Sequence, residues 1–131
     1  MTREDTVRHY YSAWEKKEWN LIDGMLADGF TFISPNDSDR LNRREFHTKC
    51  WPEAGWIKRF DLESVAARDS GVFVRYLCHT RNGRSFRNIE YFQFSDEKIA
   101  SIECYFGGQQ GHPSQNASVE EMERILSVDR P

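Results

Sequence analysis

Residues 72–106 read VFVRYLCHTRNGRSFRNIEYFQFSDEKIASIECYF and contain the clearest structural signals in this chain. Two turn signals, Arg81-Asn82-Gly83-Arg84 and Ser95-Asp96-Glu97-Lys98, divide them. Asn82-Gly83 indicates a short hairpin, because Asn and Gly tolerate a positive φ. With a further turn at Asp69-Ser70-Gly71, the pattern predicts four consecutive antiparallel strands, at residues 57–68, 72–80, 84–94 and 98–106.

The N-terminal part of the chain is predicted to be helical. An apolar quartet recurs at i, i+3, i+4 and i+7 and therefore lies on one face of a helix: Val7, Tyr10, Tyr11 and Trp14. Thr2 and Asp5 suit a capping box at its start. The other predicted elements are helices at 19–26, 42–49 and 118–127 and a strand at 30–33. Because helices precede a run of consecutive strands, the fold class is α+β with an antiparallel sheet.

Composition limits the classes of protein that this chain can belong to. Its 131 residues fit one domain, and 38% hydrophobic with 30% charged residues indicate a soluble globular protein. A net charge of −3 argues against nucleic acid as the main partner. No apolar stretch suits a membrane helix or a signal peptide. Cys50, Cys78 and Cys104 are far apart, which indicates free thiols in a reducing cytoplasm and no zinc signature.

Several local strings carry a family resemblance. They are HYYSAW at 9–14, LADGF at 26–30, REFH at 44–47, NIEYFQF at 88–94 and KIASIECYFG at 98–107. In these strings and in the order of its elements, the chain resembles the nuclear-transport-factor-two-like superfamily as far as Phe106. This superfamily includes ketosteroid isomerases, scytalone dehydratases and SnoaL-like polyketide cyclases.

The resemblance implies a fold and an assembly. The expected fold is a cone-shaped α+β barrel, with a curved, mostly antiparallel sheet wrapped around the N-terminal helices. A pocket opens between helices and sheet, and dimers form through the outer sheet face. Residues 1–131 would be a single SnoaL-like domain with 107–131 as a C-terminal extension, and no cofactor is implied.

The resemblance also assigns roles, and one of them fails on this sequence. Tyr10 falls at the oxyanion tyrosine of ketosteroid isomerases and Glu90 at their oxyanion aspartate. The position of their general base, directly before a proline, is Ser34. A serine hydroxyl cannot accept a proton near neutral pH as a carboxylate does, so steroid isomerisation is disfavoured.

Strand alternation extends the candidate pocket. If Glu90 faces inward, Asn88, Phe92 and Phe94 also do, because side chains alternate between faces. A register slip of one residue would reverse every such assignment on a strand. Lining the neighbouring strands up with the family places inward Phe73, Arg75, Leu77 and His79, together with Ile102, Cys104 and Phe106.

These positions predict a polar site. We expect Tyr10, His79 and Glu90 as catalytic residues, with Arg75 paired to Glu90 and lowering its pKa, which would suit a polar or anionic small ligand. Asp37 and Asp39 are turn formers that would act only if their loop folded over the pocket mouth. Tyr10 as plain core, a structural Arg75–Glu90 ion pair and an ordinary hydrogen-bonded His79 remain open alternatives. The predicted substrate-binding residues are Trp14, Ser34, Phe46, His47, Arg75, Asn88, Phe92, Cys104 and Phe106.

Two functional hypotheses follow. The first is a cofactor-free lyase, isomerase or cyclase that acts on a small oxygenated organic molecule. The second is a non-catalytic ligand-binding or dimerisation module. Both predict a homodimer, and no metal site is readable from the sequence.

Overall fold

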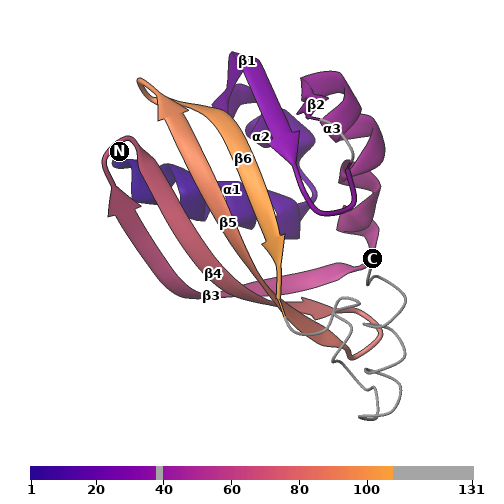
Figure 1. The fold of residues 1–131 in the computed structure, drawn as a ribbon. Helices are drawn as coiled ribbons and strands as arrows, with labels where there is room; N and C mark the ends of the chain where they lie inside the picture. The colour runs from indigo at the N-terminus through magenta and orange to yellow at the C-terminus, as the bar shows by residue number, and fades with distance from the viewer. Residues whose placement is uncertain (38–39, 108–131) are drawn as a thin grey trace, which may run out of the picture.

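The computed structural model describes residues 1–37 and 40–107. The predicted helix at 118–127 therefore lies outside the described residues, as does Asp39. The elements follow the predicted order, with two short additions, β2 and η1 (Figure 1). They are α1 (Arg3–Lys16), α2 (Trp19–Met25), β1 (Leu26–Ile33), β2 (Leu41–Asn42), α3 (Arg43–Lys49), η1 (Trp51–Gly55), β3 (Ile57–Arg68), β4 (Gly71–Thr80), β5 (Ser85–Ser95) and β6 (Lys98–Phe106).

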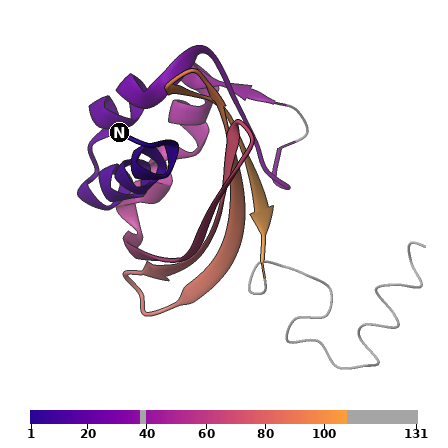
Figure 2. The same cartoon turned by 90° about the vertical axis from the view of Figure 1, so that its left-hand side faces the viewer.

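One six-stranded sheet, in the order β2-β1-β6-β5-β4-β3, forms the main layer. All of its neighbours pair antiparallel except β1 and β6, which run parallel. The sheet curves around α1 without closing on itself (Figure 2). The α+β class and the curved, mostly antiparallel sheet are thus confirmed, and the predicted barrel is an open one.

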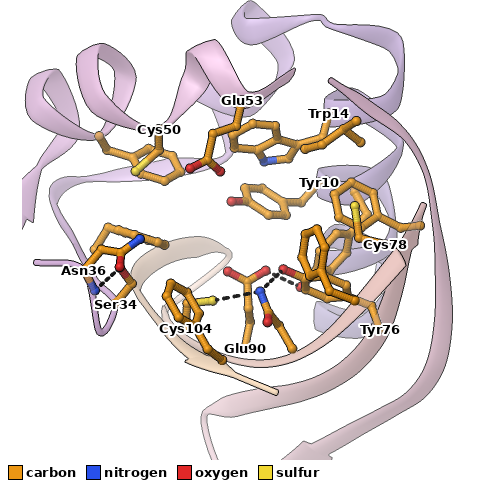
Figure 3. Close-up of a pocket in the computed structure, with 18 of the residues that line it drawn as sticks. Tyr10, Trp14, Ser34, Asn36, Cys50, Glu53, Tyr76, Cys78, Glu90 and Cys104 are labelled. Atoms are coloured by element: carbon orange, nitrogen blue, oxygen red, sulfur yellow. Dashed lines mark hydrogen bonds between the residues drawn. The ribbon is translucent and has the colours of Figure 1, made fainter. Parts of the chain in front are cut away.

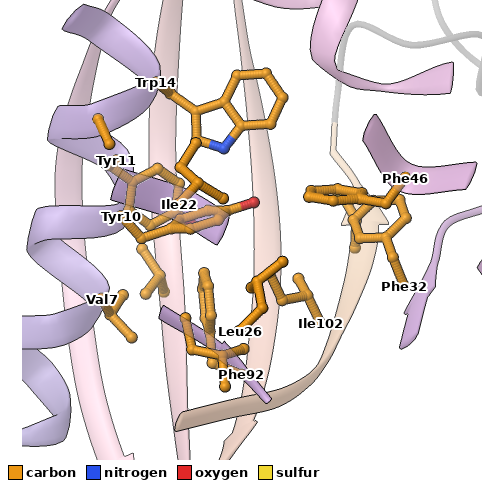
Figure 4. Packing of buried hydrophobic residues seen from close by; sticks show 14 of the residues in the cluster. Val7, Tyr10, Tyr11, Trp14, Ile22, Leu26, Phe32, Phe46, Phe92 and Ile102 are labelled. Carbon is orange, nitrogen blue, oxygen red and sulfur yellow. The ribbon is translucent and has the colours of Figure 1, made fainter. Parts of the chain in front are cut away.

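Helix α1 fills the concave side of this sheet (Figure 2). Its capping box forms as predicted: the Thr2 hydroxyl accepts from the Asp5 amide at 3.0 Å, and the Asp5 carboxylate accepts from the Thr2 amide at 3.1 Å. The apolar quartet of α1 is buried against α2, α3 and the sheet, in a core rich in aromatic rings (Figure 4).

The α2–β1 junction begins earlier than predicted. The helix ends at Met25 and the strand starts at Leu26, four residues before the expected Phe30. Arg43, at the start of α3, stabilises this junction: its guanidinium donates to the carbonyls of Asp23, Leu26 and Ala27 at 2.8, 3.0 and 2.7 Å. It also contacts the Asp23 carboxylate at 2.7 Å.

Strands β5 and β6 have the predicted faces. Asn88, Glu90, Phe92 and Phe94 are buried on the concave side, and so are Ile102 and Cys104, whereas Ile89 is 43% exposed.

Strand β4 has the opposite face from the one predicted. Val74 lies directly opposite Glu90 in the β4–β5 register, and paired residues share a face of the sheet. Val72, Val74, Tyr76 and Cys78 therefore point inward and are buried. The inward placement of Phe73, Arg75, Leu77 and His79 was wrong by one residue, which is enough to move each side chain to the outer face.

Among the described residues, no helix is both long and apolar enough to cross a membrane.

Candidate functional site

A cavity of about 200 Å³ opens between α1, the α3–η1 segment and the concave face of the sheet (Figure 3). Aromatic side chains form most of its wall, with carboxyl groups at its floor and at its mouth. Its lining residues are Tyr10, Tyr11, Trp14, Phe32, Ser34, Asn36, Asp37, Phe46, Lys49, Cys50, Glu53, Trp56, Ile57, Phe60, Tyr76, Cys78, Phe86, Asn88, Glu90, Cys104 and Phe106.

Glu90 lies at the floor of this cavity, on the central strand β5. It is 6% exposed, and its Oε1 accepts a hydrogen bond of 2.7 Å from the Tyr11 hydroxyl. Val74, its neighbour on β4, is fully buried and apolar. The carboxyl is therefore removed from water without a basic side chain beside it among the lining residues of the floor.

This environment raises the pKa of Glu90 to about 7. Burial is the largest cause, because low polarity disfavours the charged form. Hydrogen bonds from Tyr11 and Cys104 act in the opposite direction, and the charge of Glu53 adds to the increase. The expected lowering by Arg75 was wrong, because Arg75 lies on the outer face, 3.6 Å from Glu63.

A second polar group on β5, Asn88, is held rigidly beside Glu90. Its Nδ2 donates to the Tyr76 hydroxyl at 2.8 Å and contacts the Cys104 sulfur at 3.5 Å. Its Oδ1 accepts from the Gly107 amide at 3.3 Å. A Cβ at Gly107 would overlap the Arg87 carbonyl oxygen, so the absence of a side chain allows the Gly107 amide to approach Asn88.

Tyr10 projects from α1 into the middle of the cavity, with its hydroxyl away from the helix (Figures 3 and 4). Burial, and then the charge of Glu90, raise the pKa of Tyr10, while a hydrogen bond from the Trp14 indole lowers it. The phenol therefore stays protonated at physiological pH and can donate a hydrogen bond to a ligand oxygen.

Two carboxyl groups lie at the mouth of the cavity. The sequence did not identify Glu53 as a pocket residue, and it identified Asp37 only on the condition that its loop folds over the mouth. The Glu53 carboxyl on η1 points into the cavity opposite Glu90 (Figure 3). Desolvation, then the charge of Asp37, raise the pKa of Glu53. Asp37 does line the mouth, where its Oδ2 accepts from the Ser34 hydroxyl at 2.8 Å.

Most residues of the predicted site lie together. Tyr10, Trp14, Ser34, Phe46, Asn88, Glu90, Cys104 and Phe106 line the cavity. Phe92 is fully buried behind Tyr10, with ring centroids 5.1 Å apart.

Three residues of the predicted site lie elsewhere. His47 is on the exposed side of α3 and stacks on Trp19 at 4.3 Å. Arg75 and His79 are on the outer face because of the β4 register, and the His79 ring is 2.7 Å from the Asp61 carboxylate. The expected polar site with two basic groups is therefore absent from the concave side of β4.

The sequence did not identify Tyr11, Tyr76 and Cys78 as pocket residues. Tyr11 shares the apolar face of α1 with Tyr10, and this pattern is the signal that could have placed it at the pocket. Tyr76 and Cys78 required the correct β4 register. Within residues 1–37 and 40–107, no three His, Cys, Asp or Glu side chains cluster as metal ligands.

Comparison with solved structures shows the same fold in several proteins. A LEH-like epoxide hydrolase from M. tuberculosis is 16% identical, with a TM-score of 0.67 over 96% of this chain and 90% of that one. A putative ketosteroid isomerase from Kribbella flavida is 11% identical, with a TM-score of 0.68 over 89% and 86%. A Catenulispora acidiphila protein with a ketosteroid isomerase-like fold, solved with trimethylamine, is 13% identical, with a TM-score of 0.65 over 78% and 85%.

No curated protein sequence matches this chain significantly. The model of the SnoaL-like domain matches residues 7–102, which include most of α1, strands β1 to β5, the first half of β6 and every cavity residue except Cys104 and Phe106. This match covers most of the chain, and the protein therefore belongs to the SnoaL-like domain family.

Proposed function

We propose that this protein binds a small oxygenated organic molecule in the cavity and that Glu90 transfers a proton to or from it. The observation that carries the proposal is a buried carboxyl with a pKa of about 7 at the floor of an aromatic cavity. A group with such a pKa is present in both protonation states at neutral pH, which suits general acid–base catalysis.

The neighbouring side chains support this chemistry. The Tyr10 phenol is available to orient or polarise a carbonyl or hydroxyl oxygen, and Glu53 offers a second carboxyl across the cavity. The reaction class that needs only such groups is a lyase, isomerase or cyclase step that begins with proton transfer. The Ser34 hydroxyl donates a hydrogen bond to Asp37, and we propose no base role for it.

The size of the cavity limits the substrate. Its volume of about 200 Å³ is below the roughly 300–1,000 Å³ of sites for drug-sized ligands, so we propose a compact substrate rather than a steroid.

The test starts from a thermal-shift screen of small carbonyl and hydroxyl compounds, since a ligand of the native state raises the melting temperature. Each compound that binds is then incubated in D₂O, and exchange of its C–H protons is followed by NMR. We expect wild type to catalyse exchange and Glu90→Gln to lose about 10²–10⁴-fold of the rate. Glu97→Gln, in the exposed β5–β6 turn, is the matched control.

Equal exchange rates in wild type and Glu90→Gln would remove Glu90 from the mechanism. Binding without exchange in any variant would favour the second candidate, a non-catalytic binding module. That candidate has one specific observation in its favour, namely a serine where the isomerase resemblance requires a base.

We also propose that two copies associate through the outer face of the sheet. Phe73, Ile89 and Tyr105 are 42%, 43% and 52% exposed there, on three adjacent strands. Such a patch is typical of an interface. Light scattering should give a dimer for wild type and a monomer for Ile89→Lys, and a monomeric wild type would contradict this assembly.

The free thiols of Cys50, Cys78 and Cys104 support a cytoplasmic location for the protein.

A further inference from the structure

The charged groups that line the cavity are mostly acidic. Glu90 lies at the floor, and Glu53 and Asp37 lie at the mouth. Among the described lining residues, Lys49 is the one basic side chain, and it is exposed at the end of α3. An anionic ligand would therefore meet like charges at both ends of the cavity, whereas a cation would meet carboxylates.

The aromatic wall favours the same sign of charge. The face of an indole, phenol or phenyl ring carries negative potential and attracts a cation within about 6 Å of the ring centre. Trp14 is 6% exposed and lies deep in the cavity, while Trp56 is 40% exposed at its edge. Tyr10, Phe60 and Tyr76 complete the wall on the side of α1 and the sheet.

We propose that the cavity binds a small organic cation, an alkylammonium whose charge lies between the Glu90 carboxylate and the aromatic rings. This inference rests on the proposed small-molecule site and names the class of its ligand. It replaces the polar or anionic ligand expected from the sequence, since the two basic groups behind that expectation, Arg75 and His79, lie on the outer face.

The volume of the cavity fits this class. A cavity of 150 Å³ lined by apolar groups is known to hold benzene, so about 200 Å³ accommodates a compact molecule of similar or slightly larger size. Choline is such a molecule. Its neutral isostere, 3,3-dimethylbutan-1-ol, has the same shape and hydroxyl group but no charge.

The test measures the affinity of both probes by calorimetry at pH 8. We expect choline to bind at least about tenfold more tightly than 3,3-dimethylbutan-1-ol, because only the cation gains the carboxylate and ring interactions. Glu90→Gln should weaken choline about tenfold and leave the alcohol unchanged. Glu97→Gln, on the exposed turn, should change neither affinity.

The affinity for choline should also depend on pH. Protonation of Glu90, whose pKa is about 7, removes the negative charge, so affinity should fall about fivefold from pH 8 to pH 6 in wild type. The same pH comparison in Glu53→Gln shows how much of the fall in choline affinity is caused by the second carboxyl, Glu53. The titratable groups that face Glu90 are Tyr10, Tyr11, Cys50, Glu53, Tyr76, Cys78 and Cys104, with Asp37 and Lys49 at the mouth.

The outcomes separate this inference from the proposed function. Equal or tighter binding of the neutral alcohol, or failure of choline to bind, overturns the cationic ligand and leaves the exchange test of Glu90 unaffected. Tighter binding of choline that survives Glu90→Gln at both pH values overturns the placement of the charge at Glu90. If proton exchange does not depend on Glu90 but choline still binds more tightly than the alcohol, the proposed function is contradicted and the cationic ligand stands.

Discussion

The Tyr11 hydroxyl on α1 donates a hydrogen bond of 2.7 Å to Oε1 of Glu90 on β5, 79 residues away in the chain. This contact joins the helix to the floor of the cavity. Because it stabilises the ionised carboxylate, it opposes the effect of burial on the pKa of Glu90. The phenol therefore helps to hold that pKa near neutrality, where proton transfer in either direction is possible.

Tyr11→Phe should raise the pKa of Glu90. A hydrogen bond to a charged group is worth about 1.5–3 kcal/mol, which corresponds to about one to two pH units. Carbon-13 NMR of glutamate-labelled protein measures the titration directly. Tyr105→Phe is the matched control, since it removes a hydroxyl that donates to Glu103 at 2.6 Å on the outer face. An unchanged or lower pKa of Glu90 in Tyr11→Phe would contradict this role.

Glu90 should also make folding stability depend on pH. Its pKa is about 7 in the folded state against 4.5 in the unfolded chain, so the folded state holds its proton to higher pH. The free energy of unfolding should therefore fall between pH 4.5 and about 7, by about 3 kcal/mol, and become level above that range.

Glu90→Gln isolates this effect. Urea unfolding of wild type and variant at several pH values should show the variant gaining about 3 kcal/mol relative to wild type between pH 4.5 and pH 8. Glu53, whose pKa is also raised, is present in both proteins, so its own titration largely cancels in their difference. Glu97→Gln should follow the wild-type curve. Parallel curves for wild type and Glu90→Gln would show that Glu90 is not neutralised by folding.

Arg43 should be a stabilising residue outside the cavity. Its side chain is 30% exposed, and the guanidinium bonds three backbone carbonyls and the Asp23 carboxylate at the α2–β1 junction. Arg43→Met should lower the free energy of unfolding by about 2–4 kcal/mol, because several acceptors lose a charged donor. Arg44→Met, on the exposed side of α3, should cost less than about 0.5 kcal/mol. Equal losses in the two variants, measured by urea unfolding, would refute the role of Arg43.

The sequence predicted the fold and part of the pocket through local patterns and through the family resemblance that they carry. The apolar face of α1 places Tyr10 and Trp14 at the cavity, and the alternation of β5, with its inward face taken from the family resemblance, places Asn88 and Glu90 there. The position of Glu53 could not be predicted from a local pattern. Its segment carries only the terminator signals Pro52 and Gly55, and its carboxyl reaches the cavity through the packing of η1 above the sheet, which no periodicity encodes.

The error on β4 arose from lining this strand up with the family, whereas the turn that follows the strand sets its register. The Thr80 amide donates to the Arg84 carbonyl at 2.9 Å, and Gly83 has a φ of +83°. The loop is thus a three-residue one, with Gly83 in the left-handed position. A two-residue loop at Asn82-Gly83 would move β4 by one position and set Arg75, instead of Val74, opposite Glu90. The alternation of side chains on β4 could not decide between these two registers, because both faces of the strand carry apolar side chains.

Arg75→Gln tests that register in solution. If Arg75 faced Glu90, its removal would raise the pKa of Glu90, because a nearby cation favours the carboxylate. In the structure Arg75 is instead 3.6 Å from Glu63 on the outer face, where Arg87 also bonds Glu63 at 2.8 Å. We therefore expect the Glu90 titration in Arg75→Gln to match wild type, with Tyr11→Phe as the variant that moves it. A higher pKa in Arg75→Gln would mean that β4 pairs one residue away from the register described above.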